Sequence, residues 1–180
     1  MAMKIQSFQT AWRKAIKQQK VLFICAFLGL GCLWTGTARA DMTAIIIDEN
    51  GLPFDLSPSN YTNSPANYDN SPENYDNSDA NYDNSPANYN NSPANYENGI
   101  NGKQRIISED NEFLGYYVFT SNNRMNLFDA SGNRIGYIPG GGHTNSVFSE
   151  SGWCGTLGEN NGQTVLGFTK DCYRQFFLDR

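Results

Sequence analysis

Three side chains in the second half of the sequence are of the types that perform nucleophilic catalysis: Cys154, His143 and Asp171. A thiol, an imidazole and a carboxylate that meet in a fold can form the triad of a small cysteine hydrolase. The sequence around Cys154 has no nucleophile-elbow pattern, and Cys172 offers its thiol a partner. We therefore expect no enzyme activity and no catalytic residues, with a small cysteine hydrolase as the alternative.

Cys154 and Cys172 are the cysteines that remain if the N-terminal segment is removed on export. An even pair in an exported protein is most simply one disulfide. It would close a loop of about 19 residues and stabilise the fold by about 3 kcal/mol. A metal site would lack a fourth strong ligand, because His143 is the only histidine. The sequence predicts a disulfide, no metal and no cofactor.

The first 40 residues have the pattern of a secretory signal peptide. Five basic residues and no acidic residue precede an apolar run over 21–34, and Ala38 and Ala40 form a small-x-small cleavage site. We predict cleavage after Ala40 and export to the periplasm, the outer surface or the medium. The alternatives are a lipoprotein that uses Cys32 and an uncleaved anchor, although a spanning helix needs about 20 apolar residues. Membrane contact is expected only through an uncleaved segment.

The charge of the remaining chain is strongly negative. Residues 1–40 hold six of the 13 Lys and Arg residues and none of the 18 Asp and Glu residues, so 7 basic and 18 acidic side chains remain, a net charge of −11. Such a surface repels nucleic acid, and no basic stripe opposes it. The expected partner is a protein or a glycan.

Six near-identical heptapeptides of the form Ser-Pro-Ala-Asn-Tyr-Asp-Asn fill residues 57–98. Five of them contain proline, which Asp79 replaces in the fourth, and proline at this spacing excludes a continuous helix. The polar composition also excludes an ordinary packed core. Two forms fit the segment. One is a disordered chain with loose turns, and the other is a short solenoid with a tyrosine column and asparagine ladders.

Residues 99–180 alternate short apolar runs, the last of them 175–178, with Gly-rich turns. This pattern predicts a mainly β domain of short strands, a small antiparallel meander or a barrel-like sheet. A weak repeat aligns 107–116 with 128–137, and each copy reads as a strand, an acidic turn and a return strand in which Gly-Tyr marks close backbone approach. Residues 46–51 resemble the first half of this unit, so we expect the strand over 44–50 to join the same sheet.

The predicted organisation is a signal peptide at 1–40, a strand and connector at 41–56, the repeat region at 57–98 and a disulfide-closed β domain at 99–180. Tyr116, Tyr137 and Trp153 are the candidate ligand contacts of the β domain, because aromatic side chains can stack on a sugar. Aromatic side chains in strands also build hydrophobic cores, so a core role for these three residues remains the alternative. The heptad tyrosines could make many weak contacts with a glycan or a partner surface.

The Asn-Tyr-Asp-Asn-Ser-Pro heptads, followed by residues 128–137, are similar to a group of uncharacterised exported bacterial proteins with such repeats. The resemblance covers about residues 57–140 and implies a bacterial source. It implies no activity and no functional residues for this chain. The expected function is that of an exported, non-enzymatic envelope or secreted protein with a repeat spacer or interaction surface. The alternative is a carbohydrate- or protein-binding module that uses the aromatic face of the β domain.

Overall fold

The computed structural model describes residues 40–179, which belong to one compact unit. The predicted signal peptide, except for Ala40, lies outside the described residues. The unit contains eight strands and one α-helix: β1 (Met42–Ile46), β2 (Arg105–Ile107), β3 (Phe113–Phe119), β4 (Met125–Asp129), β5 (Arg134–Ile138), β6 (Ser146–Ser149), β7 (Gly152–Asn160), β8 (Gln163–Phe168) and α2 (Lys170–Phe177). Five single-turn 3-10 helices lie at Glu49–Gly51, Phe54–Leu56, Tyr61–Asn63, Tyr68–Asn70 and Gly140–Gly142.

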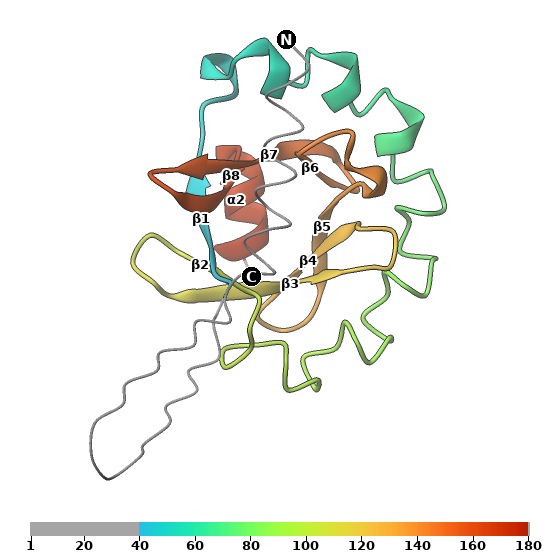
Figure 1. Cartoon of the computed structure of the whole chain (residues 1–180), viewed down its shortest axis with the longest axis vertical. Helices are drawn as coiled ribbons and strands as arrows, with labels where there is room; N and C mark the ends of the chain where they lie inside the picture. The colour runs from blue at the N-terminus through green and yellow to red at the C-terminus, as the bar shows by residue number, and fades with distance from the viewer. Residues whose placement is uncertain (1–39, 180) are drawn as a thin grey trace, which may run out of the picture. The chain divides into compact units, whose positions relative to one another are not determined.

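The strands close into a barrel in the order of the sequence (Figure 1). Strands β2 to β8 form an antiparallel meander, in which each strand pairs with the next. Strand β1 closes the barrel because it pairs in parallel with β2 on one side and with β8 on the other. The prediction of a mainly β, barrel-like domain is confirmed, and the strand expected over 44–50 joins the same sheet, as strand β1, which ends at Ile46.

The 21-residue repeat corresponds to two hairpins, β2–β3 and β4–β5. Ile107 pairs with Phe113 in the first, and Phe128 pairs with Arg134 in the second. The glycine before each tyrosine marks close backbone approach, as predicted. A Cβ on Gly115 would lie 2.1 Å from a carbonyl oxygen of β4, and one on Gly136 would lie 2.7 Å from a carbonyl oxygen of β6. A side chain at either position would therefore push neighbouring strands apart.

The C-terminal segment is a helix and not the strand that the 175–178 run suggested. Thr169 begins α2 by accepting the backbone N–H of Cys172 at 3.3 Å. Cys172 and Phe176 are buried, four residues apart on one helix face, and the Phe176 ring meets Phe168 of β8 edge-on at 5.6 Å. The strand prediction was wrong because a four-residue apolar run does not distinguish the two periods, whereas the buried pair spans a full helical turn.

The predicted disulfide is present. Cys154 of β7 and Cys172 of α2 are bonded, with their Cα atoms 5.6 Å apart. The bond fastens the helix to the barrel wall beside the contact between Phe176 and Phe168.

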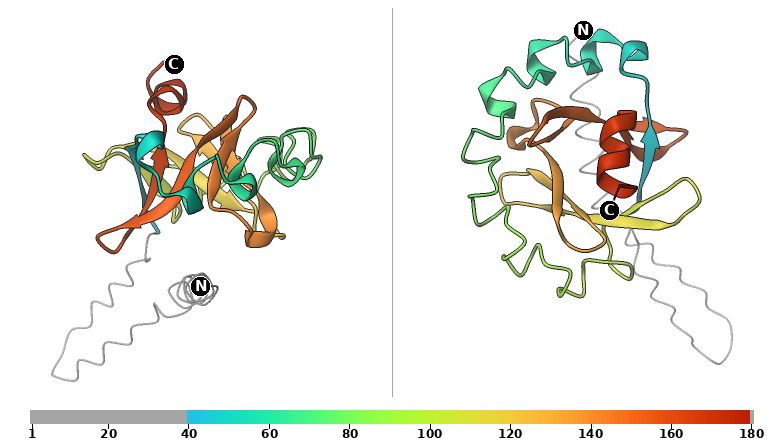
Figure 2. Two further views of the ribbon diagram at one scale, coloured as in Figure 1. Left: turned by 90° about the horizontal axis from the view of Figure 1, so that it is seen from above. Right: turned by 180° about the vertical axis from the view of Figure 1, so that it is seen from behind.

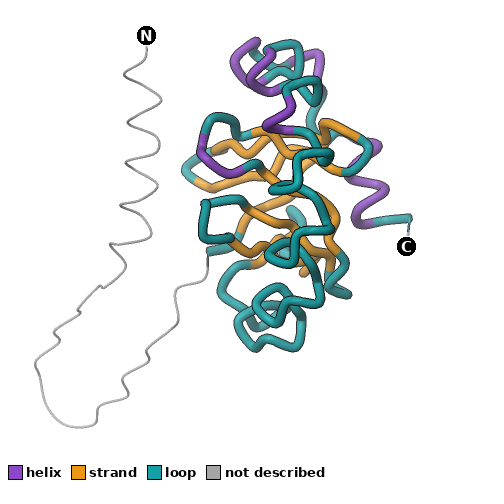
Figure 3. The backbone as a smooth tube through the Cα atoms, turned by 90° about the vertical axis from the view of Figure 1, so that its right-hand side faces the viewer, coloured by secondary structure: helices purple, strands orange, loops and turns teal. Residues whose placement is uncertain are grey.

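Residues 57–98, which we call the belt, are a continuous run of tight turns that arcs round the outside of the barrel between β1 and β2 (Figures 1 and 2). In the second heptad, Asn67 donates its N–H to the Ser64 carbonyl at 3.2 Å, and Asn70 donates to the Asn67 carbonyl at 2.9 Å. The same two turns recur in every heptad. Figure 3 shows the belt loops lying over the strands.

The strand and connector at 41–56, the repeats and residues 99–180 are therefore parts of one unit. The belt has a ladder of asparagines, as in the solenoid alternative, but it lies against the barrel and its tyrosines are exposed. Asn63, at the start of the belt, contacts Thr144, whereas Asn91, later in the belt, contacts Tyr116. The belt and the barrel residues that it contacts therefore run in opposite sequence directions.

Candidate functional site

The belt has an inner face that is built from the seventh residue of each heptad. These inner asparagines are at most 9% exposed: Asn63, Asn70, Asn77, Asn84, Asn91 and Asn98. Each Nδ2 donates to two carbonyls, six and eight residues earlier in the chain; Asn84 reaches Ser78 and Asp76, both at 2.8 Å. Because both amide hydrogens are used inside the belt, the Oδ1 atom remains to accept hydrogen bonds from the barrel.

In the middle of the belt, these oxygens solvate a buried arginine. Arg124, which is 2% exposed, donates Nε to Asn77 Oδ1 and Nη1 to Asn84 Oδ1, both at 3.2 Å. Asn126 of β4 also donates to Asn84 Oδ1, at 3.1 Å. Burial lowers the pKa of Arg124, and the nearby carboxylate of Asp76 opposes this shift. Amide oxygens thus replace the water that this cation loses on folding.

At the start of the belt, the partners are Thr144 and His143, which follow β5. The Thr144 hydroxyl donates to Asn63 Oδ1 at 2.7 Å, and His143 Nε2 lies 3.0 Å from Asn70 Oδ1. The Asn70 amide nitrogen already donates to two belt carbonyls, so its oxygen faces the imidazole and can only accept. Nε2 of His143 therefore carries the proton.

The fourth heptad departs from the consensus where the barrel needs a negative charge. Its Asp79, in the position of proline, forms an ion pair with Nη1 of Arg134 from β5, whose side chain is 5% exposed. Arg134 also donates Nε and Nη2 to Asn126 Oδ1, at 2.9 and 2.8 Å, and its guanidinium carbon lies 4.8 Å from the centre of the Tyr137 ring. Burial lowers the pKa of Arg134, and Asp79 opposes the shift.

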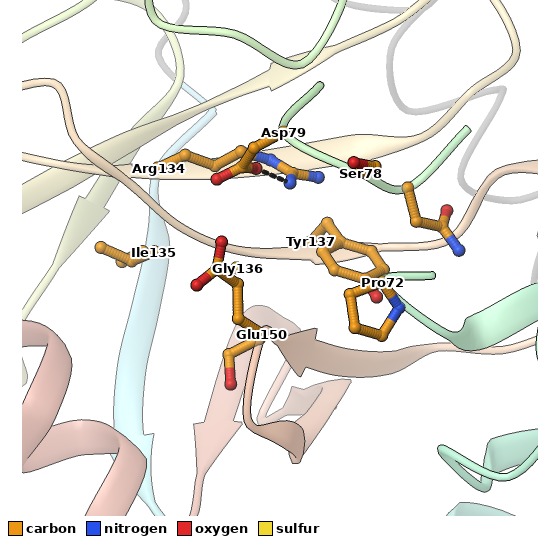
Figure 4. Close-up of a pocket in the computed structure, with 10 residues that line it drawn as sticks. Pro72, Ser78, Asp79, Arg134, Ile135, Gly136, Tyr137 and Glu150 are labelled. Atoms are coloured by element: carbon orange, nitrogen blue, oxygen red, sulfur yellow. Dashed lines mark hydrogen bonds and ion pairs between the residues drawn. The ribbon is translucent and has the colours of Figure 1, made fainter. Parts of the chain in front are cut away.

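A small cavity lies beside this ion pair, between the belt and β5 (Figure 4). Its volume is about 110 Å³, and its wall includes Pro72, Asp79, Arg134, Tyr137 and Glu150. This is enough for a few water molecules, whereas pockets for small organic ligands start at roughly 300 Å³. The cavity is a small gap under the belt and does not have the size of a sugar-binding site.

Tyr116 and Tyr137, two of the predicted ligand contacts, are buried under the belt. Their hydroxyls donate to belt carbonyls: Tyr116 to Asn91 at 2.6 Å, and Tyr137 to Asn70 at 2.8 Å. The tyrosines are 21 residues apart in the barrel, and their acceptors are 21 residues apart in the belt, which is three heptads. Burial raises the pKa of Tyr116 to about 12. Both residues fasten the belt to the barrel.

The structure also shows the contacts of the other candidate side chains, Trp153, Cys154 and His143. Trp153 is half-buried, and its Nε1 donates to Ser146 Oγ at 3.0 Å. Together with the two buried tyrosines, it makes no exposed aromatic face. The atoms of the hypothetical triad are engaged separately, because Cys154 is in the disulfide and His143 contacts the belt. The described part of the chain therefore offers this triad no free thiol.

The outer face of the belt consists of the fifth and sixth residues of each heptad. All six fifth residues are tyrosines with 60–79% of their surface exposed: Tyr61, Tyr68, Tyr75, Tyr82, Tyr89 and Tyr96. An exposed carboxylate follows the tyrosine directly in four heptads: Asp69, Asp76, Asp83 and Glu97. The sequence named these tyrosines as possible contacts but did not show that all of them lie on one side.

The inner asparagines are the residues that the sequence interpretation missed. The seventh position is asparagine in all six heptads, but the first, fourth and fifth positions are equally invariant, so the repeat alone does not mark the inner position. A buried amide that bonds to backbone on one side and to the barrel on the other tolerates no other residue type easily.

Within residues 40–179, no group of His, Cys, Asp and Glu side chains is arranged to hold a metal ion. The helices of the same residues are too short or too polar to cross a membrane. Comparison of the chain with known proteins gives no match to a family model, to a curated protein sequence or to a solved structure.

Proposed function

We propose that the protein is an exported, non-enzymatic binding protein of the envelope or the extracellular medium, and that the outer face of the belt is its interaction surface. The observation that carries this proposal is the set of six tyrosines, each at least 60% exposed, at the same position of every heptad. Single exposed aromatic residues are ordinary on protein surfaces. Here six exposed tyrosines recur every seven residues along one ordered segment. A repeated exposed aromatic surface of this kind marks an interaction site.

The different positions of each heptad make different contacts, and this supports the proposal. The inner asparagine donates to main-chain carbonyls in every heptad and accepts from the barrel in four, and the Ser and Asn at the first and fourth positions stabilise the turns, as Ser64 and Asn67 do. The belt is thus held in place through other side chains, which leaves the tyrosine rings available to a partner. Equivalent contacts along one scaffold raise the overall strength of binding through effective concentration.

Export is supported by the pattern of residues 1–40 and by the disulfide, since such bonds persist in oxidising compartments. The alternative of a ligand-binding face on the barrel finds less support. Two of its three aromatic residues are buried, with their hydroxyls bonded to the belt.

A glycan array and a peptide array, probed with the exported protein, test the proposal. The variant Tyr68→Ser/Tyr75→Ser/Tyr82→Ser should lose the ligands that the wild type binds and keep its melting temperature. The matched control is Ala66→Ser/Ala80→Ser/Ala87→Ser, because serine already occupies this exposed position as Ser59 in the first heptad. Ligands that survive the tyrosine changes but are lost on Trp153→Phe would favour the barrel alternative and contradict the proposal.

A further inference from the structure

The outer face has a charge pattern that limits which partners fit it. The belt contains no Lys or Arg, and Asp69, Asp76 and Asp83 are exposed directly after a tyrosine. Two cations of the barrel that contact the belt, Arg124 and Arg134, are buried beneath it. The surface that a partner meets therefore combines aromatic rings with carboxylates.

One carboxylate that follows a belt tyrosine is already paired with a lysine of the same chain. Lys103, just beyond the belt, places Nζ 2.7 Å from Glu97 Oε1, and Glu97 follows Tyr96. The carboxylate raises the pKa of this lysine, with a smaller contribution in the same direction from Tyr96. Asp69, Asp76 and Asp83 form no ion pair within residues 40–179. The last heptad thus shows that a carboxylate at this position can pair with an exposed lysine.

We propose that the outer face binds a Lys- and Arg-rich segment of a polypeptide, one cationic side chain to each tyrosine–carboxylate pair; this inference rests on the proposed function. The carboxylate supplies an opposite charge, and the face of a tyrosine ring attracts a cation within about 6 Å. The heptads repeat the same pair along the belt, so a segment with several cationic residues can engage several pairs at once.

The curvature of the belt favours a flexible partner. The belt follows an arc round the barrel (Figure 2), so its outer face is convex. A flat, rigid surface would touch only part of such an arc. A disordered basic segment can bend along it, and such segments bind by wrapping large surfaces.

The experiment measures binding of a fluorescent deca-lysine peptide to the exported protein. Its matched control is the same peptide with every lysine acetylated, which keeps the length and removes the charge. The variant Asp69→Asn/Asp76→Asn/Asp83→Asn should bind deca-lysine about tenfold more weakly, since each exposed ion pair contributes about two- to threefold. Asparagine suits this position, because Asn90 occupies it in the fifth heptad.

A second variant controls for net charge. Glu73→Ala/Glu109→Gln/Glu159→Gln removes three exposed carboxylates that do not follow a belt tyrosine. It should weaken deca-lysine binding by less than about twofold, whereas Tyr68→Ser/Tyr75→Ser/Tyr82→Ser should weaken it several-fold. Equal losses in the two acidic variants, or equal binding of the acetylated peptide, would overturn the inference.

The outcomes also separate this inference from the proposed function. A neutral glycan such as chitohexaose that binds through the belt tyrosines, while deca-lysine does not bind, would refute the cationic partner and leave the interaction surface standing. If no array ligand or peptide depends on the belt tyrosines, both proposals fail.

Discussion

The carboxylate of Asp79 pairs with the guanidinium of Arg134, and Asp79 occupies the position that proline holds in the other five heptads. The Arg134 side chain is almost completely buried, so a proline at residue 79 would leave this cation without its counter-charge. Asp79, the exception to the consensus, therefore fixes the register of the heptads against the barrel. Only one alignment of the six heptads with the barrel places a carboxylate beside Arg134.

The substitution Asp79→Pro, which restores the consensus, should destabilise the protein. We expect a loss of about 2 kcal/mol in the free energy of unfolding, below the roughly 3–5 kcal/mol of a fully buried pair because the carboxylate is half exposed. Backbone strain should contribute little, because five heptads accept proline at this place. Urea unfolding measures the change.

The matched control is Asp69→Asn, which removes a belt carboxylate that has no ion pair to the barrel in the described residues. Its effect should stay within about 0.5 kcal/mol. Adding Arg134→Met to Asp79→Pro should recover part of the stability, since the unpaired charge is gone. Wild-type stability of Asp79→Pro alone would show that the ion pair does not set the register.

Asn84→Ala should be more damaging than alanine at an exposed belt asparagine. It removes the donors to the carbonyls of Asp76 and Ser78, and the acceptor of Arg124 and Asn126. Unsatisfied buried groups destabilise by about 1–3 kcal/mol each in isolation, and we expect about 3 kcal/mol in total after relaxation. Asn90→Ala, at an exposed sixth position, should change the unfolding midpoint little.

Tyr116→Phe should change how stability depends on pH. The pKa of Tyr116 rises from 10.0 to about 12 on folding, so the neutral hydroxyl is favoured in the folded state. Its contribution is complete below the unfolded pKa and is lost as the pH rises from about 10 to about 12. The variant should lose about 1 kcal/mol near neutral pH with its hydrogen bond to Asn91.

Between pH 10 and 12, the stability of Tyr116→Phe should fall less steeply than that of the wild type. Some decline should remain in the variant, because burial also raises the pKa of Tyr117 and Tyr137. Unfolding midpoints measured along this pH range provide the comparison. Parallel curves for the two proteins would contradict the assignment.

Residues 99–180 alone should not fold, although the sequence interpretation treated them as a domain. They lack β1, which pairs with four residues of β8 and two of β2, so two strand edges would be left open. Circular dichroism and proton–nitrogen NMR should show a disordered or aggregated fragment, in contrast to residues 41–180. A well-dispersed spectrum from 99–180 would refute this.

The strands, the hairpins and the disulfide could be predicted from local signals. Apolar runs between glycines, the Gly-Tyr pairs at 115–116 and 136–137, and an even number of cysteines each act within a short stretch or through a simple count. The joining of β1 to the sheet was predictable because residues 46–51 resemble the first half of the repeated hairpin unit.

The position of the belt could not be predicted because its contacts are distant in sequence and polar. Thr144 bonds to Asn63, 81 residues away, and Arg124 bonds to Asn77, 47 residues away. Hydropathy carries no information about such pairs, since an inner asparagine and an exposed one look alike. The same limit applies to the candidate ligand contacts, because whether Tyr116 is a core residue or a ligand contact depends on what covers it, and the belt covers it.

The spacing between the two tyrosine anchors limits how the gene for this protein can change in length. Tandem coding repeats readily gain or lose whole units, but Asn70 and Asn91 must stay three units apart to meet Tyr137 and Tyr116. An insertion between them would move one of these acceptors away from its tyrosine, and an insertion between Asn63 and Asn70 would separate Asn63 from Thr144. Added units should therefore be better tolerated after Asn91 than between Asn63 and Asn91.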